Sequence, residues 1–256
     1  MKRFLCSVML IGSVFLAAGS TVSLADSKTT AKVVASKGKL EILDNPIVFD
    51  RLRIIRDKRT KPFVFRESMD EIARQLIYEA VKNLPMKTVA VRTPVGKAEC
   101  KCIDRTKGVF FVTILRAALG MSHVAEKIAP HAEIHHLGMY RDEDTLKPHW
   151  YYNTLPDFKK RKDVSDIRVY ILDPMLATGG SICESIKQYV DKGIKEENIT
   201  VLCVISAPEG IEKIFKTFPK ARIVTAAVDE KLNDKGYIVP GLGDAGDRYF
   251  NFAPSK

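Results

Sequence analysis

The stretch from Val169 to Ser181 constrains the fold of this chain more than any other segment. Its first part, up to Leu172, is a β-branched and aliphatic run of the kind found in strands that are buried on both faces of a parallel sheet. Asp173 and a loop with two glycines follow, and Ser181 stands where a helix N-cap is expected, with apolar residues at helical spacing behind it. The segment therefore predicts a strand, a tight loop and a helix in succession.

The loop of this stretch predicts a phosphate site. Backbone N–H groups converge where a loop runs into a helix, and the helix dipole favours an anion at the same place. Gly179 and Gly180 allow the backbone to approach a phosphate closely, and Asp173 is placed to accept hydrogen bonds from the hydroxyl groups of a sugar. A tight turn that binds nothing is the alternative interpretation of the residues from Thr178 to Ser181.

Strands and helices alternate along most of the chain. We expect strands at residues 109–115, 132–140, 169–172, 199–206 and 222–228, separated by helices over residues 121–129, from Ser181 and from Pro208. This alternation predicts an α/β fold with a doubly wound, mainly parallel sheet. A charged helix over residues 51–59 and an amphipathic helix from Phe65 to Pro85 precede it, and residues 86–107 predict a β-hairpin arm.

The start of the chain has the layout of a secretory signal peptide. A basic start precedes an apolar run from Phe4 to Ala18, and small residues follow as far as Ala25. The run is short for a membrane span, so no stable span is expected. We expect residues 1–25 to be a leader, residues 26–40 a linker and residues 41–256 one folded domain. A working leader implies export to the periplasm or the outside, and the alternative is a cytoplasmic protein with an uncleaved extension.

The net charge leaves several kinds of ligand open, whereas the cysteine and histidine residues form no pattern typical of a metal site. The formal net charge of +10 suits a polyphosphate ligand, an RNA or solubility alone. The five cysteines do not form a disulfide framework, and Cys100 and Cys102 have the wrong spacing for a zinc ligand pair. His135 and His136 face opposite sides of a predicted strand. We therefore expect no metal ion to be held by the protein alone.

Two further stretches predict ligand contacts. Arg116 follows a buried strand, where a lone cation is costly unless it meets an anion, and ligands bind at the carboxyl edge of open parallel sheets. Residues 237–248 form a glycine-rich loop whose backbone groups can contact a flat ring. Gly241, Gly243 and Gly246 match a GxGxxG pattern, but the βαβ unit that gives this pattern its dinucleotide-binding meaning is not predicted around them.

Four segments resemble, in the same order, motifs of type I phosphoribosyltransferases: Thr113–Met121, Met139–Glu143, Asp173–Ser181 and Tyr237–Asp247. The first two resemble the family's pyrophosphate-binding loop and its mobile loop, and the third resembles its loop for phosphoribosyl pyrophosphate (PRPP). The third and fourth are similar to uracil phosphoribosyltransferases in particular, and the fourth resembles their uracil-binding segment. Thr113 and Ala118 depart from the first motif, because the family has Pro and Gly there.

The resemblance implies an enzyme of pyrimidine salvage that condenses uracil with PRPP to give UMP and diphosphate. It implies that Mg²⁺ arrives bound to PRPP, and that residues 41–256 form a phosphoribosyltransferase domain with a C-terminal base-binding loop. A homodimer or a higher homo-oligomer is implied, and a GTP effector is compatible with the family. No nucleic-acid partner is expected.

The resemblance also implies a role for each site residue. Asp173 would hold the ribose hydroxyls, and Arg116 and Arg141 would neutralise the leaving pyrophosphate, so these three are the expected catalytic residues, acting by charge and positioning. The residues implied to bind PRPP are Arg116, Arg141, Asp173, Pro174, Met175, Leu176, Ala177, Thr178, Gly179, Gly180, Ser181 and Asp244. The residues implied to bind uracil are Ile238, Gly243, Asp244 and Ala245.

Three other interpretations stay open on the sequence. One is a phosphoribosyltransferase for a different base. Another is an RNA-binding regulator on the same fold that senses PRPP or UMP, which the basic charge suits. The third is an exported relative with weakened activity, which is motivated by the leader and by Ala118, since a Cβ there could restrict a backbone that must turn toward a pyrophosphate.

Overall fold

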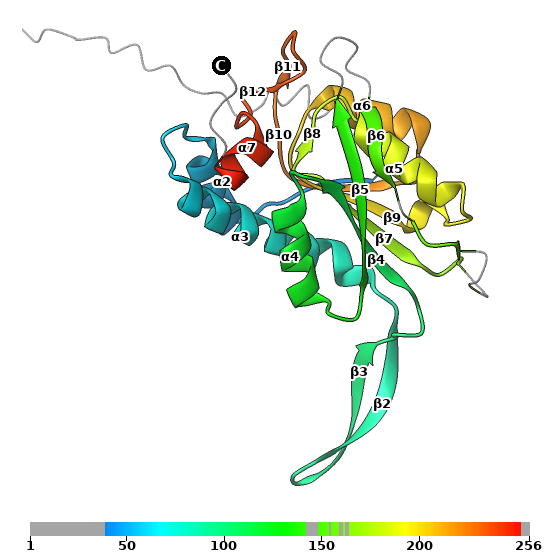
Figure 1. The fold of residues 1–256 in the computed structure, drawn as a ribbon. Coiled ribbons are helices and arrows are strands. Elements are labelled where there is room, and N and C mark those ends of the chain that lie inside the picture. Colours follow the sequence, from blue (N-terminus) through cyan, green and yellow to red (C-terminus); the bar gives the residue numbers. More distant parts are fainter. Residues whose placement is uncertain (1–38, 142–147, 154, 159–160, 162–163, 252–256) are drawn as a thin grey trace, which may run out of the picture.

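A mainly parallel sheet forms the centre of the computed structural model, which describes residues 39–141, 148–153, 155–158, 161 and 164–251 (Figure 1). Its strands are β1 (Lys39–Ile42), β4 (Val109–Leu115), β5 (Glu133–Arg141), β6 (Pro148–Asn153), β7 (Arg168–Leu172), β8 (Met175–Leu176), β9 (Ile199–Ser206) and β10 (Arg222–Val228). The strand order is β1-β10-β9-β7-β4-β5-β6, with β8 beside β9. Only the pairing of β5 with β6 is antiparallel. The predicted α/β class is confirmed.

Helices cover both faces of the sheet, as the doubly wound prediction requires (Figure 1). They are α2 (Pro46–Arg56), α3 (Pro62–Ala80), α4 (Leu119–Ile128), α5 (Gly180–Val190), α6 (Pro208–Thr217) and α7 (Ala245–Phe250). On one face α2, α3 and α4 pack against Phe111 and Tyr170, whose ring centroids lie 5.2 Å apart. On the other face α5 and α6 pack with Phe110 and Val169. Successive strand residues point to opposite faces, so continuous apolar runs fill both cores.

The helix α2 begins earlier than the charge pattern predicts. The prediction was residues 51–59, whereas the helix runs from Pro46 to Arg56. Asn45 is its N-cap, because the side-chain oxygen accepts a hydrogen bond of 2.9 Å from the backbone N–H of Ile47. Proline at the first helical position is favourable, since its missing N–H would have no partner there.

The predicted hairpin arm is confirmed. It consists of β2 (Met86–Thr93) and β3 (Gly96–Ile103), which pair antiparallel with Met86 opposite Ile103 and Thr93 opposite Gly96. The hairpin extends away from the sheet and its helices (Figure 1). Most of its side chains are therefore exposed, including Val95 at the turn, which is 98% exposed.

Other elements also differ from the predictions. Lys39 and Leu40, which the sequence assigns to a linker, lie in β1, because this segment pairs in parallel with β10. The helix expected to start at Ser181 starts at Gly180, and its N-cap is Gly179 in the left-handed conformation, not the predicted serine. The edge strand β6 was not predicted, because its aromatic residues lack the alternation of a half-buried strand.

Several predictions concern residues outside the described ranges. The leader of residues 1–25 and most of the linker lie there, and so do residues 142–147 after β5. In the part of the chain that the structure describes, no helix has both the length and the apolar character needed to cross a membrane.

Candidate functional site

A cavity of about 380 Å³ lies at the carboxyl ends of β4, β5 and β7. This is the edge of an open parallel sheet where ligands bind. The walls come from the segment after β4, the end of β5, the loop between β7 and α5, and a C-terminal segment that includes β12 (Ile238–Val239) and the start of α7. Four segments far apart in the sequence therefore meet at one place.

The loop between β7 and α5 forms the wall that the sequence identifies as a phosphate site. Residues 177–181 all line the cavity. Gly179 has a φ of 73°, which reverses the chain so that α5 begins directly after it. The N-terminal N–H groups of this helix, together with its dipole, make the wall suitable for an anion.

The phosphate loop rests on the first turn of α6. A Cβ added to Gly210 would lie 2.4 Å from the carbonyl oxygen of Ala177, and one added to Gly179 would lie 3.0 Å from the carbonyl oxygen of Gly210. The two backbones therefore touch directly, and only glycine fits at position 210 without displacing the loop.

Asp173 follows β7 directly and lines the cavity. One oxygen of its carboxyl group accepts a hydrogen bond of 3.2 Å from the backbone N–H of Met175, which also lines the cavity. Burial raises the pKa of Asp173 to about 7, and the hydrogen bond from Met175 opposes this only in part. A carboxyl group in this position can accept hydrogen bonds from the hydroxyl groups of a ligand.

Pro174 and Leu176 were predicted in the same ligand-binding loop, but they lie outside the cavity lining. The carbonyl oxygen of Pro174 accepts hydrogen bonds of 3.0 Å from the backbone N–H groups of Val204 and Ile205. Leu176 is fully buried among the side chains that pack against α5 and α6. The structure thus places these two residues where they fasten the loop to β9.

Arg116 contributes the cation of the cavity wall beyond β4. Its guanidinium lies 3.8 Å from a carboxylate oxygen of Asp247 in α7, and its side chain is 58% exposed. The peptide bond before it, Leu115–Arg116, is cis. Arg116 thus brings a positive charge to the cavity wall, at a position that the sequence predicts.

The end of β5 and the strand β6 contribute another part of the cavity wall. Arg141 ends β5, but its side chain and residues 142–147 lie outside the described part of the chain, so its contact with a pyrophosphate stays a prediction. Tyr140 lines the cavity. Tyr151 of β6 also lines it and was missed. A Cβ on Gly138 would lie 2.5 Å from the Tyr151 ring, so the glycine makes room for this aromatic wall.

The C-terminal segment forms the remaining wall, and all four residues predicted to bind a base lie in it. Ile238, Gly243, Asp244 and Ala245 line the cavity. Gly243 has a φ of 82°, which turns the chain into α7. Asp244 is the N-cap of this helix, since a carboxylate oxygen accepts a hydrogen bond of 2.8 Å from the N–H of Asp247.

The cavity combines four kinds of chemical group. A helix start suits a phosphate, Arg116 suits a further anion, and the Asp173 carboxyl group suits hydroxyls. The backbone of the C-terminal loop suits a flat polar ring. Within the described residues, no three histidine, cysteine, aspartate or glutamate side chains gather in a group that could hold a metal ion.

Comparisons with known proteins agree on one family. The family model described as uracil phosphoribosyltransferase matches residues 42–252. The uracil phosphoribosyltransferase of Limosilactobacillus fermentum is 46% identical over 213 residues, which are 83% of this chain and 98% of that protein. The corresponding protein of Dictyoglomus turgidum is 48% identical over 209 residues, covering 82% and 97%.

A solved structure also matches the fold. A protein of Aquifex aeolicus superposes with a TM-score of 0.76 at 34% sequence identity, and the match covers 84% of this chain and 100% of that one. The arrangement of the sheet and its helices is therefore shared with an experimentally determined protein.

Asp173 should make the stability of the ligand-free protein depend on pH. Its pKa is 3.8 ordinarily and about 7 in the folded protein, so between these values the folded state holds a proton that the unfolded chain has released. The free energy of unfolding should therefore fall as pH rises from about 4 to 7. We expect Asp173→Asn to lack this decline and to be more stable than the wild type at pH 8, as measured by denaturant unfolding at a series of pH values.

The control is Asp234→Asn, which removes a carboxyl group from an exposed turn. It should follow the pH profile of the wild type. Parallel profiles for the wild type and Asp173→Asn would contradict the burial of this carboxyl group.

Proposed function

The chain belongs to the uracil phosphoribosyltransferase family, and we propose that its cavity condenses uracil with PRPP to give UMP and diphosphate. It is accordingly a pentosyltransferase of UMP salvage. The observation that carries the proposal is the meeting of the phosphate loop, Arg116, Asp173 and the C-terminal loop around one cavity. The phosphate, the diphosphate, the ribose and the base each have a group of suitable charge or hydrogen-bonding capacity in the cavity wall.

PRPP is held along the sheet side of the cavity in this proposal. Residues 177–181 at the start of α5 bind the 5′-phosphate, because their backbone N–H groups and the helix dipole favour an anion. Asp173 accepts hydrogen bonds from the ribose hydroxyls. Arg116, with Arg141 from the end of β5, stabilises the negative charge that builds up on the leaving diphosphate.

The reaction is a displacement at C1 of the ribose. The C1–O bond to diphosphate breaks as a uracil nitrogen bonds to C1, the proton of that nitrogen passes to the released diphosphate or to water, and the transition state has oxocarbenium character. Much of the rate gain comes from holding two reactants at the right distance and orientation. The arginines supply the remaining electrostatic contribution, since they meet a charge that increases toward the transition state.

Uracil is bound by the C-terminal loop. The ring presents two carbonyl acceptors with an N–H donor between them, and backbone groups at Ile238, Gly243 and Ala245 can supply the complementary donors and acceptor. Cytosine reverses this pattern at one edge and leaves backbone groups unpaired, which is costly inside a closed site. Asp244 lies where the ribose and the base join.

The proposal extends to the metal and the assembly. Mg²⁺ arrives on PRPP, as the family resemblance implies. A homodimer or a higher homo-oligomer is supported by the β2–β3 hairpin, whose Met86, Val91 and Val95 expose apolar surface to solvent. Control by GTP rests on the family resemblance alone.

The central prediction is formation of UMP. Purified full-length protein incubated with labelled uracil, PRPP and Mg²⁺ should produce labelled UMP and diphosphate, measured by chromatography. Asp173→Asn should lower kcat/KM for PRPP by about 100-fold or more, because a neutral amide oxygen replaces the carboxylate that accepts from the ribose hydroxyls, and the amide NH2 cannot accept.

The control for that assay is Asp234→Asn, which should leave the rate unchanged. Absence of UMP in the wild type, or equal rates for the wild type and Asp173→Asn, would refute the proposal. Product from another nucleobase and none from uracil would assign the chain to a different specificity.

Gly210→Ala should weaken PRPP binding although it does not line the cavity. Its Cβ would lie 2.4 Å from the carbonyl oxygen of Ala177, so the phosphate loop must shift. We expect KM for PRPP to rise by about 10- to 100-fold. Gly96→Ala is the matched control, since its Cβ would meet nothing within 4 Å. An unchanged KM for PRPP would contradict the close contact.

We further propose export, on the leader of residues 1–25. Protein tagged at the C-terminus should lose the leader and appear outside the cytoplasm after cell fractionation, with its N-terminus at Asp26 by mass spectrometry. Replacing Lys2 and Arg3 by aspartate should retain the full-length protein inside. A full-length wild type in the cytoplasm would contradict export and would suit an enzyme that uses PRPP made inside cells.

A further inference from the structure

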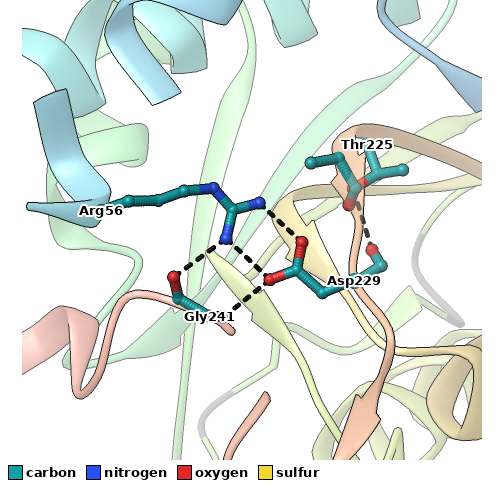
Figure 2. Close-up of polar contacts among 6 residues, drawn as sticks. Arg56, Thr225, Asp229 and Gly241 are labelled. Atoms are coloured by element: carbon teal, nitrogen blue, oxygen red, sulfur yellow. Dashed lines mark hydrogen bonds and ion pairs between the residues drawn. The ribbon is translucent and has the colours of Figure 1, made fainter. Parts of the chain in front are cut away.

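Two charged side chains outside the cavity hold the loop that forms its base side. Arg56 is the last residue of α2, and Asp229 follows β10 directly. Figure 2 shows their ion pair, in which the two guanidinium nitrogens lie 2.8 Å and 2.6 Å from the two carboxylate oxygens. This two-point geometry is stronger and more directional than a single hydrogen bond.

Both partners also bind the backbone of Gly241 (Figure 2). The N–H of Gly241 donates a hydrogen bond of 2.8 Å to Asp229, and its carbonyl oxygen accepts one of 2.9 Å from Arg56. Gly241 lies between Ile238 and Gly243, two residues of the proposed base site. The ion pair therefore fixes the middle of the loop from which the base-binding backbone groups project.

The conformation at Gly241 needs this support. Its φ is 60°, and an added Cβ would lie 2.2 Å from the carbonyl oxygen of Ile238. The loop thus turns tightly at Gly241. The backbone N–H of this residue is bound by Asp229, and its C=O is bound by Arg56. Without these bonds the turn would lose the contacts that select it over other conformations.

Asp229 is itself fixed to the sheet. Its backbone N–H donates a hydrogen bond of 2.9 Å to the carbonyl oxygen of Ser206 in β9. The side chain is only 5% exposed, so the carboxylate depends on Arg56 and Gly241 for its hydrogen bonds. Ser206 is held in turn by a hydrogen bond of 2.9 Å from its hydroxyl group to that of Thr225 in β10. The ion pair of Arg56 and Asp229 therefore anchors the loop at Gly241 to the central sheet.

The strand pairing of the C-terminal loop is too short to hold the loop in position against the central sheet by itself. β12 pairs only with the two-residue strand β11 (Lys231–Leu232), and neither joins the central sheet. A second arginine, Arg248, donates hydrogen bonds to the carbonyl oxygens of Leu242, at 2.7 Å, and Asp57, at 2.8 Å. That contact ties the loop to the end of α2, whereas Asp229 ties it to the sheet.

We propose that Arg56 and Asp229 are positioning residues for uracil. They do not touch the base, and they orient it by fixing the backbone of Gly241. This inference rests on the proposed function, because it assumes that residues 238–245 bind the base. The phosphate loop and Arg116 belong to other walls of the cavity, and Asp244 is the one residue of the C-terminal loop that is also assigned to PRPP, so the pair acts mainly on the base.

The test compares steady-state kinetics of full-length variants with the two substrates varied separately. Arg56→Met keeps the aliphatic part of the side chain and removes all three hydrogen bonds to Asp229 and Gly241, and we expect KM for uracil to rise by about 10- to 100-fold. KM for PRPP should stay within about twofold. Arg56→Lys, which retains the charge but not the planar two-point geometry of the guanidinium, should give an intermediate KM for uracil.

Arg53→Met is the matched control, since Arg53 lies on the same helix in an exposed ion pair with Asp50 at 2.9 Å. It should behave as the wild type. Asp229→Asn removes the ion pair while retaining an oxygen that can accept from Gly241, and it should also raise KM for uracil selectively.

The outcomes separate this inference from the proposed function. A wild type that makes no UMP refutes the function itself. A wild type that makes UMP, with variants that leave KM for uracil unchanged or raise both KM values equally, overturns the positioning role alone. If Arg56→Met fails to fold, Arg56→Lys and Asp229→Asn decide the question, and failure of all three to fold would mean that the pair is structural.

Discussion

The parallel pairing of β4 with a neighbour on each side is the constraint on which the site depends. Leu115 of β4 lies opposite Gly138 of β5, and Thr113 lies opposite Leu172 of β7. Because these strands run in the same direction, the residues that follow them emerge at one edge of the sheet. Arg116, Tyr140 and Asp173 therefore lie at the same edge and line the same cavity. The sheet is in turn held by apolar strand side chains buried under helices on both faces.

The two halves of the site are held by different forces. The PRPP side is built on sheet hydrogen bonds and on backbone contact between Gly179 and Gly210, so it is stiff wherever the core is intact. The base side belongs to a C-terminal segment that does not join the central sheet and is fastened by side chains. Arg56 and Arg248 bind its carbonyl groups, and the hydroxyl group of Tyr249 donates a hydrogen bond of 2.9 Å to Asp70. Changes at these side chains should thus affect one substrate more than the other.

Sequence reasoning recovered what is local and missed what depends on distant contacts. The bounds of β4, β9 and β10 are those predicted, because each is an apolar run between residues that end a strand. The N-cap at Gly179 was missed, since serine is the usual capping residue and the left-handed turn shows only in the backbone. Tyr151 depends on the space at Gly138 across a strand pair. The ion pair of Arg56 and Asp229 joins residues 173 positions apart, which no local pattern reveals.

The two departures from the family motif bear on stability and not on the shape of the cavity. Ala118 has a φ of −85°, which any L-amino acid adopts, and its side chain is fully buried, so its Cβ restricts no turn toward the ligand. Thr113 is also fully buried, and its hydroxyl group finds no hydrogen-bond partner among the described residues, which costs about 1–3 kcal/mol of stability. Neither residue lines the cavity. Ala118 therefore gives no structural reason to expect a weakened enzyme.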